Sequence, residues 1–250
     1  MKLWLYWLVF FAIIIIRYFL FSGGTYLLFY SSLSTLFFKQ SLCLKIPQWE
    51  SIKKDIQLSM ISAAIFSCCA TFIITEYNLG QTQLYTTLSE YRLWYLVVSF
   101  LGILLLQDTC FYFIHRLFHH PLLFKRLHYG HHRSKAPTPW TAFALDPMEA
   151  LLQGMFLVGV VFIVPLHWLV LAFLLMTMTI WAVLNHLGFE LFPSSFPNHW
   201  LGRWLIGSTH HSIHHRNYAV HYGLYFTFWD RLLGTHDPDY EKKFNSWLKR

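Results

Sequence analysis

The sequence predicts an all-α fold, an integral membrane helical bundle of about four spans with a cytoplasmic helical cap. Of its 250 residues, 56% are hydrophobic and only 12% are charged, whereas charged residues make up about a quarter of an ordinary soluble domain. Apolar stretches close to the ~20 residues that cross a bilayer recur along the chain. Its histidines cluster at helical spacing beside these stretches. We expect a single domain over residues 1–250.

The N-terminal stretch and the next two apolar stretches predict the first spans. Residues 3–38 are apolar apart from Arg17 and carry Ser22-Gly23-Gly24 near their middle. This pattern fits either one span with an interfacial segment or two short helices. Residues 58–75 and 94–114 each predict one further span.

Residues 150–184 form an apolar block that is too long for one span. It is interrupted at residues 165–167, Pro-Leu-His, because proline cannot continue a helix. We therefore expect a helical hairpin of two short spans, with His167 at its tip and away from any ligand.

Lysine and arginine predict the orientation in the membrane. Residues 115–148 hold five of them and residues 185–250 hold seven, together 12 of the 19 in the chain. The positive-inside rule places both segments in the cytoplasm, and a hairpin over 150–184 would return the chain to the same side. The formal charge of +7 therefore reports topology, and we expect no nucleic-acid partner.

Three histidine runs predict a metal site. HYGHH and HSIHH share one spacing, and HRLFH ends an apolar stretch; their histidines are His128, His131, His132, His211, His214, His215, His115 and His119. Residues i, i+3 and i+4 share a helix face, so we expect each three-histidine run to direct its imidazoles to one spot. Neutral imidazole suits iron, zinc, copper or nickel.

The same motifs carry a family resemblance. HRLFHH at 115–120, LHYGHH at 127–132, NHLGFE at 185–190 and THHSIHH at 209–215 resemble the fatty acid hydroxylase/sterol desaturase superfamily of membrane-bound di-iron oxygenases. The resemblance covers about residues 108–237. APTPWTAFALDPMEALLQ and YGLYFTFWDRLLGT are most similar to the lathosterol oxidase branch of sterol desaturases.

The resemblance completes the ligand set. It implies that His186, in NHLGFE, is a further ligand. Nine imidazoles exceed the four to six positions of one ion, so we expect two iron ions held by His115, His119, His128, His131, His132, His186, His211, His214 and His215. Two further candidates are His120, under an HxxxxH reading, and Glu190, where some relatives have histidine.

Two residues are expected to act outside the ligand shell. Asp108 lies seven residues before His115, two helical turns away, where a carboxylate can orient a ligand imidazole. His210 lies off the face of the last run. Asp146 is a departure, because sterol desaturase relatives usually have histidine before this proline; if that histidine contacts substrate or metal, the substrate here differs.

The remaining histidines are not predicted to bind metal, and four aromatic residues are predicted to contact the substrate. His199, His221 and His236 are isolated in the sequence and predict surface or packing positions. Trp140, Phe143, Tyr222 and Tyr225 flank the histidine motifs and are expected to line an apolar substrate tunnel.

The leading functional hypothesis is a lipid oxygenase. The resemblance implies that the irons activate O2 to hydroxylate or desaturate a C–H bond of a lipid, with a sterol favoured and a fatty acyl, sphingoid or carotenoid lipid as the alternative. No haem, flavin or nicotinamide motif occurs, so electrons must come from outside, from a ferredoxin or a cytochrome b5-like protein with a reductase. A histidine-rich membrane metal transporter would need ligands within the spans, and a zinc hydrolase needs only three protein ligands.

Overall fold

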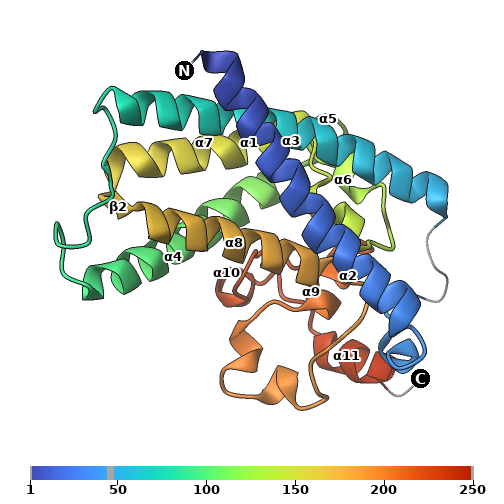
Figure 1. Ribbon diagram of the computed structural model, residues 1–250. Helices are drawn as coiled ribbons and strands as arrows, with labels where there is room; N and C mark the ends of the chain where they lie inside the picture. The colour runs from blue at the N-terminus through green and yellow to red at the C-terminus, as the bar shows by residue number, and fades with distance from the viewer. Residues whose placement is uncertain (1, 44–47, 249–250) are drawn as a thin grey trace.

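The computed structural model describes residues 2–43 and 48–248 and shows a helical bundle. Four helices are long and apolar enough to cross a membrane: Leu3–Ser32, Trp49–Asn78 (α3), Trp94–Phe118 (α4) and Trp168–Asn185 (α8). The shorter apolar helix α7, Pro147–Ile163, packs against α3. Figure 1 shows α3, α7, α8 and α4 in a layered bundle that the N-terminal helix crosses at an angle. These lengths and compositions indicate a multi-pass membrane protein, as predicted.

The N-terminal helix is continuous over Leu3–Ser32, which fits the one-span alternative and contradicts two separate short helices. It comprises α1 (Leu3–Tyr18), a π turn (Phe19–Gly23), α2 (Gly24–Leu27) and a second π turn (Leu28–Ser32). A Cβ at Gly23 would lie 2.9 Å from the Trp140 ring. The small residues therefore allow another segment to pack closely, and they do not break the helix.

The hairpin predicted over 150–184 is confirmed. Helices α7 and α8 are joined at Leu166–His167 (β2), which pairs in parallel with Leu84–Tyr85 (β1). Nε2 of His167 lies 2.9 Å from the Thr86 carbonyl, so this histidine stabilises the turn at the bundle end that is remote from the other histidines.

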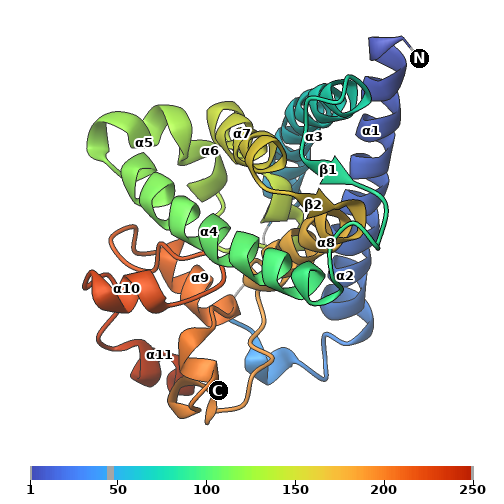
Figure 2. The same ribbon diagram turned by 90° about the vertical axis from the view of Figure 1, so that its left-hand side faces the viewer.

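Short elements cover the opposite end of the bundle. They are α5 (Pro121–Leu127), α6 (Tyr129–His132), α9 (Ser208–His214), α10 (Phe228–Leu232) and α11 (Tyr240–Leu248), with 3-10 turns at Phe38–Gln40, Pro139–Phe143, Phe196–Asn198 and Gly202–Trp204. Figure 2 shows α9, α10 and α11 together on one side of α4. Ile213, Tyr240 and Phe244 form a separate buried core beneath α9 and α11. The predicted helical cap is thus present as a structural unit.

Candidate metal centre

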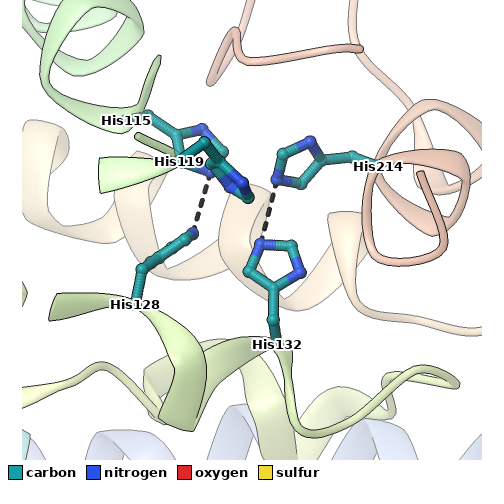
Figure 3. Close-up of side chains that lie close together, drawn as sticks. All are labelled: His115, His119, His128, His132 and His214. Atoms are coloured by element: carbon teal, nitrogen blue, oxygen red, sulfur yellow. Dashed lines mark hydrogen bonds between the residues drawn. The ribbon is translucent and has the colours of Figure 1, made fainter. Parts of the chain in front are cut away.

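The nine predicted ligands come together at the capped end of the bundle and form two groups. The first group consists of His115, His119, His128, His132 and His214, and the second of His131, His186, His211 and His215. Within each group, one nitrogen atom per imidazole lies within 4.8 Å of the others. Figure 3 shows the rings of the first group converging from three segments of the chain. We call these two groups together the metal centre.

Each three-histidine run is divided between the two groups, so the expectation that a run serves one spot is wrong. His128 and His132 belong to the first group, and His131 between them belongs to the second. In the later run the pattern is reversed, since His211 and His215 enter the second group and His214 the first. Adjacent residues project about 100° apart around a helix, because one turn takes 3.6 residues. Neighbouring histidines therefore face different groups.

Helix ends position the ligands. His115 lies in the last turn of α4, His119 is the residue that ends that helix, and His186 is the residue that ends α8. His128 separates α5 from α6 in a non-helical conformation, with φ −150° and ψ −5°. The ligands thus come from the points where helices stop, which brings four distant segments to one place.

The ring nitrogens are oriented as metal ligands require. Nδ1 of His115 lies 2.9 Å from the Tyr222 carbonyl, and Nδ1 of His131 lies 3.1 Å from the Ala144 carbonyl. A carbonyl only accepts hydrogen bonds, so each Nδ1 carries the proton and each Nε2 presents a lone pair. In the same way, Nδ1 of His186 lies 2.7 Å from the Ala182 carbonyl, and Nδ1 of His214 lies 2.7 Å from the Val220 carbonyl.

Two close contacts between these lone-pair nitrogens show that the residues fit a metal. Nε2 of His115 lies 3.0 Å from Nε2 of His128, and Nε2 of His131 lies 3.3 Å from Nε2 of His186. In neutral rings protonated on Nδ1, neither contact contains a hydrogen, so the nitrogens repel each other unless a cation lies between them. Both ring nitrogens of His119 are buried without any partner in the described residues. The donor set suits one cation in each group.

Burial keeps the ligands neutral. Desolvation lowers the pKa of His131 to about 4 and that of His186 to about 3. It also holds the pKa values of His132, His211 and His214 well below the usual range. These side chains are unprotonated at neutral pH, which is the form that binds metal.

A carboxylate that the sequence analysis missed orients one ligand. Oε2 of Glu149 lies 2.7 Å from Nδ1 of His128, and both side chains are buried. Glu149 occupies the first turn of α7, 21 residues from His128. A carboxylate on the outer nitrogen fixes the ring and makes Nε2 a stronger donor. The only sequence signal was an acid at the start of an apolar helix, which is costly without a partner.

Asp108 acts differently from the prediction. Its Oδ1 accepts hydrogen bonds from the backbone N–H groups of Leu224, Tyr225 and Phe226 at 2.7–3.2 Å, and within residues 2–43 and 48–248 it forms no hydrogen bond with the His115 ring. It therefore fixes the loop whose Tyr222 carbonyl accepts from His115. Asp108 thus affects His115 indirectly, through the backbone of the loop that carries the Tyr222 carbonyl.

Comparison with known proteins matches this geometry to a family. A model of the fatty acid hydroxylase family matches residues 100–235, which contain all nine predicted ligands. The chain belongs to the fatty acid hydroxylase family. It is 33% identical over 186 residues to a Delta(7)-sterol 5(6)-desaturase of Gibberella zeae, covering 74% of this chain and 56% of that protein. It is also 33% identical over 218 residues to the lathosterol oxidase of Homo sapiens, covering 85% and 71%. No solved structure matches the chain.

Family membership confirms the resemblance drawn from the motifs. These relatives are named Delta(7)-sterol 5(6)-desaturase and lathosterol oxidase. The match covers little more than half of the Gibberella protein's length.

Three acidic or histidine candidates lie outside the two groups in the described structure. Glu190 accepts from the backbone N–H groups of Phe192 and Thr209, each at 3.0 Å, and thereby stabilises the start of α9. His120 is exposed at the start of α5. Asp146 accepts from the N–H groups of Gly130 at 2.7 Å and His131 at 3.3 Å. Asp146 thus fixes the first turn of α6.

His210 belongs to a third histidine group that the sequence analysis did not foresee. His210, His221 and His236 each offer a nitrogen within 4.8 Å of the others, and His210 stacks on Tyr240 with ring centroids 3.8 Å apart. His221 and His236, although isolated in the sequence, pack against His210 and Tyr240, which agrees with the predicted packing role. His199, in contrast, is exposed as predicted.

An apolar cavity of about 250 Å³ lies among α1, α3, α7 and α8. Phe143 lines it, but Trp140, Tyr222 and Tyr225 do not. Trp140 instead packs against Tyr18 of α1, and Tyr225 donates a hydrogen bond to Gln107. Of the four aromatic residues assigned to a substrate tunnel, the structure brings one to this cavity.

Proposed function

We propose that the chain is a membrane-bound di-iron oxygenase that hydroxylates or desaturates a C–H bond of a lipid, with sterols as the favoured class. The observation that carries the proposal is the metal centre, in which eight buried imidazoles and the half-buried His119 form two groups, with lone-pair nitrogens about 3 Å apart. The names of the sterol-oxidising relatives support the lipid class.

The protein's own contribution is to hold neutral rings in place before the metal arrives. Carbonyl groups and Glu149 fix the outward nitrogens of five ligands: His115, His128, His131, His186 and His214. Iron bound by such rings supplies the activation of O2 needed to oxidise an unactivated C–H bond. Burial of the ligands excludes bulk water, which protects reactive species from side reactions.

The apolar cavity supports a lipid substrate because three of its lining residues lie next to, or include, the groups that hydrogen-bond to predicted ligands. Gln153 lines the cavity and donates to Glu149 at 3.4 Å, and Glu149 holds His128. Ala182 also lines it, and its carbonyl accepts from His186. Leu145 lines it directly after Ala144, whose carbonyl accepts from His131. An apolar chain in the cavity would thus end beside both groups.

We infer that the metal centre faces the cytoplasm. The capped end of the bundle carries the segments 115–148 and 185–250, which are rich in lysine and arginine, and such segments remain cytoplasmic. A ferredoxin or a cytochrome b5-like protein with its reductase would supply two electrons per turnover from that side.

Three alternatives can be distinguished from this proposal. Asp146, where sterol desaturase relatives usually have histidine, touches α6 and keeps hydroxylation of an acyl, sphingoid or carotenoid lipid open. A metal transporter is disfavoured because the predicted ligands lie at helix ends and not in the middle of spans. A zinc hydrolase would not need nine imidazoles.

Metal analysis combined with lipid mass spectrometry tests the proposal. Freshly purified protein should contain two iron ions per chain, and one ion, none or zinc alone would contradict a di-iron centre. Cells that express the protein should accumulate a lipid with one added oxygen for a hydroxylase, or two fewer hydrogens for a desaturase. His131→Ala should abolish that product while the protein still inserts in the membrane. His199→Ala, which changes an exposed histidine, is the matched control and should leave the product unchanged.

A further inference from the structure

The apolar cavity contains one charged side chain that nothing else in the described structure neutralises. Arg17 lies midway along the first apolar helix and lines the cavity opposite α7 and α8. The other lining side chains are apolar except for a few such as Gln153 and Thr179. Nε of Arg17 is buried without a hydrogen-bond acceptor, and no carboxylate in residues 2–43 and 48–248 forms an ion pair with this side chain.

The nearby acids already have partners. Asp55 accepts from Ser134 and Thr141 and lies 3.9 Å from Arg133. Glu149 is engaged by His128. The guanidinium of Arg17 instead lies over the Phe143 ring, 5.8 Å from its centroid. An arginine in a membrane span is costly and marks a functional site by default, since an unpaired cation loses its hydration there.

The position of Arg17 places it near the metal end of the cavity. Its neighbour Tyr18 donates to the Trp140 carbonyl at 2.9 Å, which fixes this turn of α1 against the segment 139–143. Phe143, beneath the guanidinium, directly precedes Ala144, which holds His131. The rest of the cavity extends toward Trp168 at the start of α8, at the far end of the bundle.

We propose that Arg17 binds an acceptor oxygen at the polar end of the lipid substrate and orients that end toward the metal centre, with the apolar tail directed toward Trp168. This inference rests on the proposed function, because it takes the cavity as the substrate site. Guanidinium offers five donors and no acceptor, so it selects hydroxyl, carbonyl or carboxylate oxygens over hydrocarbon. The oxidised carbon then lies near the polar end of the substrate.

Binding of paired probes to iron-loaded protein in lipid nanodiscs tests this role without turnover. One pair is a saturated steroid alcohol and the same steroid hydrocarbon without oxygen; the other is stearic acid and octadecane. Each probe also dissolves in the lipid of the nanodisc, but to the same extent for every variant. The comparison of one probe pair between variants therefore removes this contribution. The wild type should prefer the oxygenated member of at least one pair, and Arg17→Leu should reduce that preference about tenfold, as expected for one charge-assisted hydrogen bond. The affected pair tells whether a hydroxyl or a carboxylate is recognised.

Ile13→Ala is the matched control. Ile13 lines the same cavity one helical turn earlier, so its loss should weaken both members of a pair equally and leave the preference unchanged. Arg17→Lys, which keeps the charge, should retain part of the preference. An unchanged preference in Arg17→Leu, with two irons still bound, would overturn the role of Arg17 and leave the di-iron proposal intact. Loss of iron from the wild type would contradict the di-iron proposal instead.

Discussion

The metal centre and the third group, His210, His221 and His236, are neighbours on α9, yet their imidazoles are held in different ways. In the metal centre, outward Nδ1 atoms donate to carbonyl groups and Nε2 atoms face one another. In the third group, Nδ1 of His210 accepts from the Gly207 N–H at 3.3 Å, which leaves the proton on Nε2. His221 and His236 approach through their Nδ1 atoms at 3.5 Å.

The difference shows that proximity of histidines does not by itself make a metal site. Imidazoles meet in both places, five and four of them in the metal centre and three in the third group. In the metal centre, carbonyl and carboxylate acceptors hold the outward nitrogens of five rings, and such support from outside is what a metal ligand needs. The third group resembles a packed polar core, with Tyr240 stacked on His210. His221 also has a φ of 60° and is the sole non-glycine residue with positive φ among the described residues. Histidine, like asparagine, tolerates this conformation better than most residues.

The largest expected effect separates the two regions directly. His214→Ala removes a ligand from the first group and should lower product formation at least about a hundredfold, with less bound iron, because ligand loss exceeds the 10–100-fold cost of losing an outer partner. His221→Asn should keep both irons and stay within about twofold of wild-type activity. Iron content and product yield are measured on the same preparations. Loss of an iron equivalent in His221→Asn would show that the third group binds metal.

A smaller effect is expected at the acid that supports the metal centre. Glu149→Leu leaves Nδ1 of His128 without its acceptor and should lower activity about 10–100-fold. Glu149→Gln keeps an acceptor oxygen of similar size, so it should lose less. Measured kcat with bound iron per chain checks both variants. Equal losses in the two variants would show that the charge matters more than the orientation of the ring.

The smallest effect concerns acid stability and the third group. Burial lowers the pKa of His221 to about 3 and that of His236 to about 4, with Arg231 adding to the effect on both and Asp237 opposing it. The unfolded chain therefore binds more protons below its pKa of about 6.5, so stability present above that pH is lost as pH falls toward 4.

Thermal unfolding in detergent at pH 7, 5.5 and 4.5 checks this prediction. His221→Asn should lose less stability than the wild type on acidification, by on the order of 1–2 kcal/mol at pH 5. Metal release also depends on pH, so the difference between variant and wild type is the informative quantity. Identical pH dependence in the two proteins would show that the third group is already protonated or exposed.

Local patterns in the sequence were sufficient for much of the architecture. Apolar length predicted the spans of α3, α4 and α8, and Pro165 predicted the hairpin. The spacing of histidines predicted eight of the nine residues that converge, and the family resemblance supplied the ninth, His186. These features depend on helix geometry and on bilayer thickness, which act within a few turns of one segment.

Tertiary packing decided what those patterns left open. Adjacent histidines such as His131 and His132 separate into different groups only because four segments converge around them. The partners of Glu149 and Asp108 lie 21 and more than 100 residues away, and no periodicity records contacts at such separations. The sequence by itself determined which side chains could bind metal; only the packing of α4, α7 and α9 with their loops determined which nitrogens face inward, because hydrogen-bond acceptors from distant segments set the position of each proton.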